Sequence, residues 1–191
     1  RRQELIMTLC PSNTPLTGLY IVETSSFSDQ RGSFTRLFCE HELSAVLGER
    51  RIVQINQSVT AKIGSVRGMH FQYPPAAEMK LIRCLKGRVF DVAVDLRTNS
   101  PTFLRWFAME LSGENKKMMV IPEGFAHGFQ TLEENSEMLY LHTCFYQPDA
   151  ESGVRFDDPA LRIEWPLPPK DVSARDSGHK FISKNFEGIK L

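Results

Sequence analysis

The chain has 191 residues, a length that fits one domain with a sizeable hydrophobic core. Its formal net charge is zero, from 23 basic and 23 acidic residues, so the composition gives no electrostatic footprint for nucleic acid or an anionic membrane surface. No apolar run is long enough to span a bilayer. A local basic pocket for a phosphate remains compatible with this balance.

The N-terminal residues contain two arginines but no apolar h-region and no small-residue cleavage site. The four cysteines are scattered and form no C-x-x-C pair. We therefore expect reduced thiols in a cytoplasmic protein. We expect an N-terminal extension over residues 1–15 and a single domain over residues 16–191.

The regular elements begin with a short helix expected over residues 40–47, which Gly48 ends. Residues 52–59 then alternate as a strand. Residues 81–96 predict two strands joined at Lys86-Gly87, a plausible hairpin turn.

The second of these two strands carries apolar residues on both faces. Phe90, Val92 and Val94 share one face, and Val89 and Asp91 share the other. Further strands are expected over residues 118–121 and 137–146, and residues 165–191 should wrap the barrel as loops and short turns. Short strands with regular Gly and Pro punctuation indicate an all-β sandwich or barrel.

The first chemically suggestive segment surrounds His70. A strand here places Gly68, His70 and Gln72 on one face, and Lys80 and Arg83 follow after a short turn. A histidine and two cations can therefore converge on one cavity, and histidine as a residue type suits proton transfer near neutral pH. By itself, His70 is more simply read as a half-buried strand histidine.

The second segment has the spacing P-x-G-x-x-H and ends at His127, which resembles the second motif of the cupin family of double-sheet barrels. In metal-binding cupins this histidine joins an H-x-H pair and a glutamate of the first motif. Here Gln72 stands in place of one imidazole, and glutamine is a poor transition-metal ligand. A site of His70, Glu78 and His127 stays open as an alternative, ranked below a metal-free site.

Two tyrosines and a late aspartate complete the set. Tyr140 and Tyr146 share strand parity, so both can face one cavity, where a phenol can donate a proton and a ring can stack on a base. Asp176 can hydrogen-bond the far ring nitrogen of a histidine and fix its tautomer. Taken singly, the tyrosines are more commonly core residues and Asp176 a loop aspartate.

Together these segments resemble the dTDP-4-dehydrorhamnose 3,5-epimerase family over nearly the whole chain. Several long motifs occur in the order expected for that family. They are residues 29–34 (DQRGSF), 54–58 (QINQS), 67–72 (RGMHFQ), 91–97 (DVAVDLR), 100–103 (SPTF), 121–129 (IPEGFAHGF) and 157–159 (DDP). The resemblance implies a cupin jelly-roll barrel, a homodimer, and no metal or organic cofactor.

The resemblance also implies residue roles. His70 matches the general base, Asp176 its paired carboxylate, Tyr140 the proton donor on the opposite sugar face, and Lys80 the group that stabilises the enolate oxygen. The positions that match nucleotide-sugar contacts are Gln54, Asn56, Arg67, His127, Tyr146 (stacking on thymine), Glu151, Arg175 and Arg31, the last donated by a swapped strand of the partner subunit.

The chain departs from the family pattern at a few positions. Arg36 stands where a glutamate is common, Glu78-Met79 replaces a Gln-rich stretch, and Arg175 replaces a lysine. Arginine keeps the charge but not the geometry of lysine. These changes leave the proton-transfer residues intact and bear on which nucleotide and sugar are bound.

The activity implied is inversion of C3 and C5 of a dTDP-4-keto-6-deoxyhexose through an enolate, in deoxysugar biosynthesis of the dTDP-rhamnose type. Three alternatives remain at this point: epimerisation at one carbon only, a metal-dependent cupin enzyme, and a non-catalytic sugar-binding cupin.

Overall fold

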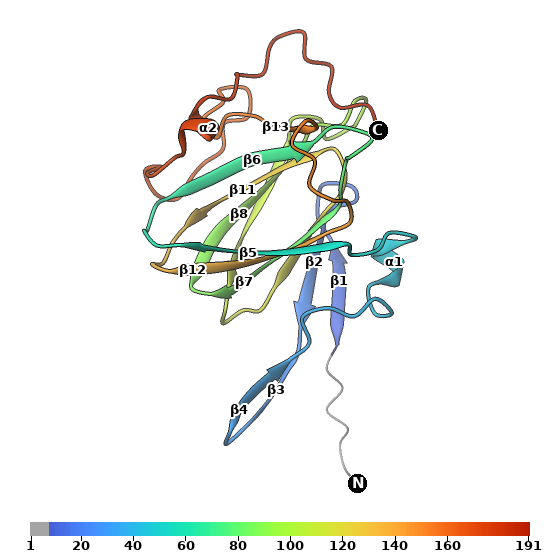
Figure 1. Ribbon diagram of the computed structural model, residues 1–191, viewed down its shortest axis with the longest axis vertical. Coiled ribbons are helices and arrows are strands. Elements are labelled where there is room, and N and C mark those ends of the chain that lie inside the picture. Colours follow the sequence, from blue (N-terminus) through green and yellow to red (C-terminus); the bar gives the residue numbers. More distant parts are fainter. Residues whose placement is uncertain (1–7) are drawn as a thin grey trace.

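The computed structural model describes residues 8–191 and consists of two antiparallel β-sheets packed face to face, with a long C-terminal segment lying over one of them (Figure 1). The described helices are two single turns, α1 (Ser44–Leu47) and α2 (Ala174–Ser177). This architecture confirms the predicted all-β jelly-roll barrel with few short helices and a C-terminal wrap.

One sheet has six strands and the other has five. The six-stranded sheet runs, in order, β1 (Leu9–Asn13), β2 (Tyr20–Thr24), β10 (Met118–Ile121), β7 (Lys80–Lys86), β12 (Ser136–His142) and β5 (Gln54–Thr60). The five-stranded sheet runs β13 (Glu151–Gly153), β6 (Val66–Gln72), β11 (Phe125–Thr131), β8 (Arg88–Asp95) and β9 (Trp106–Ser112). A separate hairpin of β3 (Ser26–Asp29) and β4 (Gly32–Thr35) projects away from both sheets in Figure 1.

The alternation predicted for β8 is confirmed and explains how both of its faces are used. Val89 and Ala93 belong to the core between the sheets, while Val92 and Val94 pack outward beneath the C-terminal wrap. A strand that is covered on both faces reads as nearly continuous apolar sequence, as β8 does.

The hairpin expected at Lys86-Gly87 is wrong. β7 pairs with β10 and β12, whereas β8 pairs with β11 and β9, so the chain crosses from one sheet to the other at Gly87. Gly87 has φ +74°, and a Cβ there would lie 2.6 Å from Ser136 Oγ, so this corner requires glycine.

The helix expected over residues 40–47 is shorter than predicted, because only Ser44–Leu47 is helical and the preceding residues form turns. Gly48 ends it as expected, with φ +60°. A helix of one turn is unstable alone. Val46 and Leu47 hold it in place by packing against Leu81 and Leu141 on the outer face of the six-stranded sheet.

The strand expected over residues 137–146 ends at His142, so Tyr146 lies in a loop and does not share a strand with Tyr140. The C-terminal wrap behaves as predicted. It is fastened at Lys170, whose N–H donates to Gly64 O, and at Ile189, whose N–H donates to Leu96 O.

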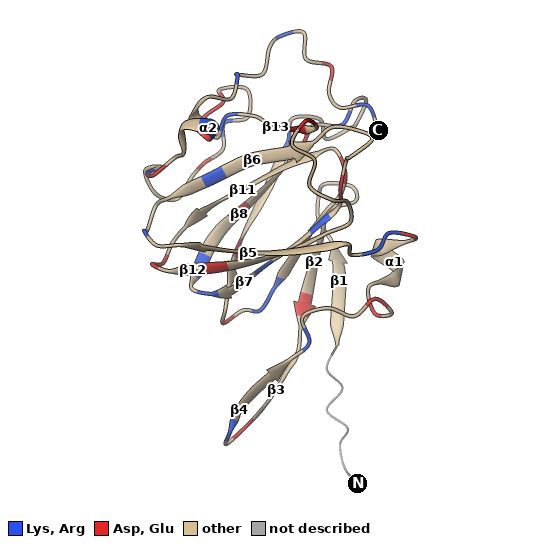
Figure 2. Ribbon diagram, in the orientation of Figure 1, with Lys and Arg blue, Asp and Glu red and all other residues tan. Residues whose placement is uncertain are grey.

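Part of the expected N-terminal extension is ordered. Residues 9–13 form β1, which pairs with β2 at the edge of the six-stranded sheet, and residues 1–7 lie outside the described residues. Lys, Arg, Asp and Glu are spread over both sheets and the loops (Figure 2). Within the described residues, the helices are too short to cross a membrane.

Candidate active site

A cavity of about 300 Å³ opens between the two sheets at one end of the barrel. Its floor and walls come from facing strands: β6 and β11 of the five-stranded sheet, and β5, β7 and β12 of the six-stranded sheet. Nine of the residues predicted from the sequence line it, namely Asn56, Arg67, His70, Lys80, His127, Tyr140, Tyr146, Glu151 and Arg175.

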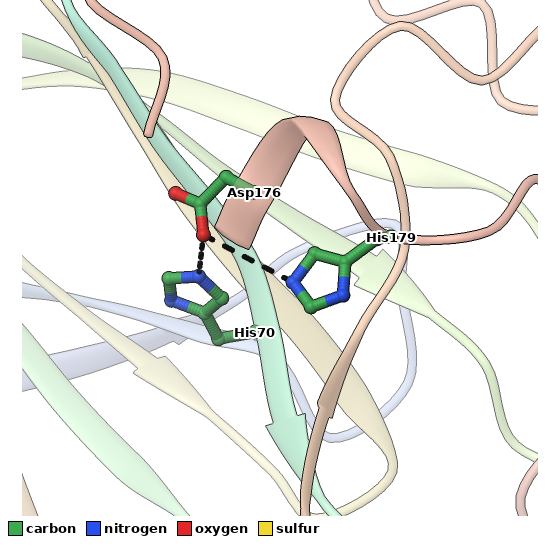
Figure 3. Close-up of side chains that lie close together, drawn as sticks. All are labelled: His70, Asp176 and His179. Carbon is green, nitrogen blue, oxygen red and sulfur yellow. Dashed lines mark hydrogen bonds and ion pairs between the residues drawn. The ribbon is translucent and has the colours of Figure 1, made fainter. Parts of the chain in front are cut away.

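The predicted contact between His70 and Asp176 is present. His70 lies on β6, and Asp176 lies on α2, more than a hundred positions later in the chain (Figure 3). His70 Nε2 lies 2.6 Å from Asp176 Oδ1. A ring that donates its Nε2–H to this carboxylate keeps the lone pair on Nδ1, so Nδ1 is the atom able to accept a proton.

Asp176 is held as a buried anion, with only 4% of its side chain exposed. Burial opposes its ionisation, but hydrogen bonds from His70 and from the Gly68 N–H, which donates to Oδ2 at 3.0 Å, bring its pKa down to about 2. Ser173 Oγ accepts the Asp176 N–H and fixes the turn that carries the carboxylate. The Asp176 carboxylate is therefore ionised at any pH near neutrality.

Gly68 brings the β6 backbone unusually close to β11. A Cβ at Gly68 would lie 2.5 Å from the Gly128 Cα, and its φ is +128°. On the same strand, the Gly68 N–H donates to Asp176 Oδ2, and His70, two residues further along, contacts Oδ1 of the same carboxylate.

Lys80 is the buried cation of the cavity, with 10% of its side chain exposed. Its Nζ lies 3.5 Å from Glu78 Oε1 and donates to the His70 carbonyl at 3.4 Å. Glu78 also accepts from His142 Nδ1 at 2.9 Å. Two acceptors thus hold the ammonium in the cavity lining, where it can neutralise negative charge on a ligand.

A second histidine–aspartate pair lies near Lys80. His127 Nε2 is 2.8 Å from Asp91 Oδ1, and both side chains are buried. Burial raises the Asp91 pKa, and the charges of His127 and Lys80 oppose that rise. His127 is therefore oriented by a carboxylate beneath it and presents its other ring edge to the cavity.

Tyr140 stands on the wall opposite His70, because β12 and β6 belong to facing sheets. Its hydroxyl is 2.8 Å from Ser58 Oγ. Burial raises the Tyr140 pKa to about 12, so the phenol is protonated at neutral pH and can act as a proton donor.

The mouth of the cavity carries the exposed ring of Tyr146. Its hydroxyl donates to Glu151 Oε2 at 2.8 Å, and Arg175 Nη1 donates to both Glu151 oxygens at 3.2 Å. Gln72 secures the loop beneath: it accepts the Gln147 N–H at 2.7 Å and donates to the Ala76 and Phe145 carbonyls. The position of the missing imidazole is thus occupied by a structural amide.

Three predicted residues lie outside the cavity lining: Asp176, which contacts His70, and also Gln54 and Arg31. Gln54 accepts the Tyr146 N–H at 3.1 Å and so supports the loop that carries the ring. Arg31 lies in the turn of the projecting β3–β4 hairpin, where it pairs with Asp29 and 87% of its side chain is exposed. Within one chain, Arg31 does not reach the cavity.

The alternative metal set of His70, Glu78 and His127 is not assembled. Glu78 contacts His142 and Lys80, and His127 contacts Asp91. Among residues 8–191, the one group of three or more potential ligands that lies close together is His70, Asp176 and His179.

Sequence reasoning missed several residues of the site. The sequence marks Asp91 only as part of a strand face and a motif, although an aspartate between apolar residues on the inward face of β8 is the available signal. Ser58 lies two residues after Asn56 on the same inward face of β5, and the sequence analysis gives it no role. His179, spaced three residues from Asp176, was also missed; burial lowers its pKa, and the nearby charge of His70 lowers it further.

Comparison with known proteins identifies the family. A family model described as dTDP-4-dehydrorhamnose 3,5-epimerase matches residues 13–184. A dTDP-4-dehydrorhamnose 3,5-epimerase of Shigella flexneri is 41% identical over 175 residues, covering 91% of this chain and 96% of the relative.

Solved structures agree with the sequence match. The Bacillus anthracis dTDP-4-dehydrorhamnose 3,5-epimerase, solved with TDP and PPi bound, superposes with a TM-score of 0.87 at 36% identity, covering 93% of this chain and all of that one. The Legionella pneumophila dTDP-6-deoxy-D-glucose-3,5-epimerase, in complex with dTDP-4-keto-L-rhamnose, gives a TM-score of 0.85 at 39% identity over 92% of this chain and 93% of that one.

Proposed function

The chain belongs to the dTDP-4-dehydrorhamnose 3,5-epimerase family, and we propose that it inverts C3 and C5 of a dTDP-4-keto-6-deoxyhexose in dTDP-rhamnose-type biosynthesis. The observation that carries the proposal is the pair of opposed groups in the cavity. A histidine oriented by a buried carboxylate faces, across the gap between the sheets, a tyrosine whose pKa of about 12 keeps it protonated.

The reaction begins with a C–H bond acidified by the neighbouring C4 ketone. His70 removes the proton through Nδ1, while Asp176 holds the Nε2–H and stabilises the imidazolium that forms. The electron pair moves to O4, where Lys80 stabilises the enolate within a cavity that strengthens electrostatic interactions. General acid–base groups of this kind contribute about 10²–10⁴-fold each.

Inversion requires the proton to return from the opposite face. Tyr140 donates it to the same carbon, and Ser58 holds the phenol in place through its 2.8 Å contact. Repeating the sequence at the second carbon requires His70 to release its proton and Tyr140 to regain one. Solvent hydrogen therefore enters both C3 and C5.

The nucleotide end of the substrate is assigned to the mouth of the cavity. The exposed Tyr146 ring offers a stacking surface for thymine, and Arg67 and Arg175 supply positive charge for the diphosphate. Gln54 supports the Tyr146 loop through the Tyr146 N–H, and Asn56 and His127 line the sugar end.

We also propose a homodimer with strand exchange. The outer face of the edge strand β5 exposes Ile55 and Val59, by 61% and 53%. The projecting hairpin exposes Phe34 by 65% and carries Arg31 away from its own barrel. A second copy that covers these apolar side chains would place the hairpin against the partner's cavity.

The decisive test is NMR in deuterated water with the dTDP-4-keto-6-deoxyglucose substrate. Wild type should incorporate deuterium at C3 and C5 and yield the doubly inverted product, and His70→Asn should abolish both. Deuterium at one carbon alone would make the protein a single-site epimerase. Exchange that survives at wild-type level in His70→Asn would remove His70 as the base.

A further inference from the structure

The strongest unexplained feature is His179, which lies beside Asp176 and His70 (Figure 3). His179 Nε2 is buried and has no hydrogen-bond partner among the described residues. It lies 3.9 Å from Asp176 Oδ1, the same oxygen that contacts His70 Nε2 at 2.6 Å. An imidazole nitrogen without a partner in such a place has a lone pair or a proton that nothing satisfies.

The structure has a defined space for the His179 ring. A Cβ at Gly153 would come within 2.4 Å of His179 Nε2, so the glycine of β13 makes room for the ring. His179 follows Asp176 by three residues across the α2 turn, which places both side chains on one side of that turn, towards β6. His70 meets them there, with its ring centroid 6.0 Å from that of His179.

Two imidazoles and one carboxylate are a ligand set for a divalent transition metal. The three ligand atoms, His70 Nε2, Asp176 Oδ1 and His179 Nε2, all lie within 4.8 Å of one another. A zinc ion with nitrogen and oxygen ligands at about 2.0–2.2 Å keeps its ligands roughly 3.3–3.5 Å apart. The site thus needs the His70–Asp176 contact to open slightly and His179 to move closer.

We propose that His70, Asp176 and His179 form an inhibitory binding site for Zn²⁺ or a similar transition-metal ion. This inference rests on the proposed function only for its inhibitory effect. When the ion binds Nε2 of the neutral His70 ring, the single ring proton moves through solvent from Nε2 to Nδ1, and no net proton is released. The base then has no lone pair to offer the substrate, so the bound ion stops proton abstraction.

The environment gives an access path and several opposing positive charges. His70 and Asp176 line a second cavity of about 470 Å³, which shares Arg67, His70 and Arg175 with the first cavity and also has Lys62 in its lining. Arg175 Nη2 lies 3.2 Å from His70 Nε2, so its charge weakens cation binding. The Arg175 side chain is 57% exposed and already contacts Glu151, which allows it to remain on Glu151 when an ion enters.

The test uses the full chain freed of metal with EDTA, titrated with ZnCl₂ in a calorimeter and followed with CoCl₂ by visible absorption. Wild type should bind one ion per chain and lose epimerase activity, which EDTA restores. His179→Gln should weaken binding at least tenfold, Arg175→Gln should tighten it, and the exposed-site control His41→Gln should match wild type. Each inhibition constant is read relative to the same variant's metal-free activity.

Two results would overturn the site: no zinc binding by wild type, or equal binding by wild type and His179→Gln. Unchanged or weaker binding by Arg175→Gln would also place the ion elsewhere. Calorimetry and cobalt absorption do not depend on turnover, so they judge the metal site even if the EDTA-treated wild type fails to epimerise. That failure would instead refute the proposed metal-free function.

Discussion

Arg175 and Asp176, neighbours in the chain, approach the same nitrogen of His70: Arg175 Nη2 at 3.2 Å and Asp176 Oδ1 at 2.6 Å. One nitrogen cannot serve both, because Arg175 only donates and ionised Asp176 only accepts. The shorter contact to a buried anion selects the Nε2–H tautomer. Arg175 then acts mainly through its positive charge. Its Nε lies 3.5 Å from Asp176 Oδ1, and the charge helps keep the carboxylate ionised.

Replacing Asp176 tests this tautomer. In Asp176→Asn the shape is kept but the negative charge that stabilises the imidazolium is lost. We expect kcat to fall by about 10²–10⁴-fold with a much smaller change in KM. Steady-state kinetics and deuterium incorporation at C3 and C5 measure the effect. Wild-type kcat in this variant would mean that Asp176 does not orient the base.

The same variant has a defined effect on stability. The Asp176 pKa is lowered on folding from 3.8 to about 2, so its contribution is complete above pH 4 and lost as the pH falls through 2. The pKa difference corresponds to about 2 kcal/mol. Wild type should therefore exceed Asp176→Asn in free energy of unfolding at pH 6, and urea titrations should show that difference shrinking between pH 4 and pH 2.

Tyr140→Phe should separate proton removal from inversion. The phenylalanine keeps the ring but has no proton to donate from the Ser58 side of the cavity. His70 still forms the enolate and returns a proton to the same face, so the substrate should exchange with deuterated water while its configuration is retained. Product formation should fall by about 10²-fold or more. Inversion at the wild-type rate would assign the acid to another group.

The Tyr140 pKa of about 12 also predicts the shape of the pH profile. A phenol that stays protonated below that value imposes no loss of activity between pH 7 and pH 10. A kcat profile should therefore remain flat over this range in wild type. A basic limb near pH 9 that disappears in Tyr140→Phe would show that substrate or the partner chain lowers the Tyr140 pKa.

Gln72 should matter for substrate affinity and not for the chemical step. Gln72→Leu removes its hydrogen bonds to Ala76, Phe145 and Gln147 and frees the loop that carries Tyr146. We expect KM to rise while kcat changes little, with a loss of about 1–3 kcal/mol in stability.

Gln130→Leu is the matched control for Gln72→Leu. It breaks an equally buried amide network at Leu167, beneath the C-terminal wrap. Its stability should fall by a similar amount while KM stays near wild type. Equal KM values for the two variants would mean that the hydrogen bonds of Gln72 do not contribute to nucleotide binding.

The sequence predicts the features that depend on a local residue pattern, and it misses those that depend on which distant segments pair or pack together. The two faces of β8 follow from alternation, but the crossing at Gly87 does not, because a Lys-Gly corner reads the same whether the next strand pairs back or joins the other sheet. Residues 143–146 resemble strand sequence, so the pattern predicts that Tyr146 lies on a strand. The chain leaves the sheet at His142 all the same.

The candidate site divides in the same way. Alternation along its segment places His70 on one strand face, and the family resemblance singles out Lys80 and Tyr140; all three line the cavity. The roles of Asp91 and His179 depend on neighbours that are distant in the sequence. Asp91 contacts His127 across the β11–β8 pairing, and His179 fills the space that Gly153 leaves. A strand aspartate or a loop histidine carries no local sign of such a neighbour.

Gly68→Ala should be strongly destabilising, because the new Cβ meets the Gly128 Cα at 2.5 Å and φ is +128°. Strain and overpacking together predict a loss of roughly 2–5 kcal/mol. Gly32→Ala separates the two effects, since Gly32 has φ +135° but nothing within 4 Å of its Cβ position. Urea denaturation should show a clearly smaller loss for Gly32→Ala, and equal losses would rule out the contact with Gly128 as the cause.

Arg31 offers a test of strand exchange that needs no structure of the dimer. It is 87% exposed on the projecting hairpin and absent from the lining of its own cavity. If it acts on the partner's nucleotide, Arg31→Ala should raise KM at least tenfold, and His70→Asn should be inactive. Each variant alone then has two defective sites per dimer.

Mixing the two variants under conditions that exchange subunits should restore activity. In a mixed dimer, the site with native His70 receives native Arg31 from the other chain, while the second site carries both defects. About half of the dimers are mixed in an equal mixture, and each has one native site, so about a quarter of wild-type activity should return. Activity that stays at the sum of the two separate variants would mean that Arg31 serves its own barrel or none.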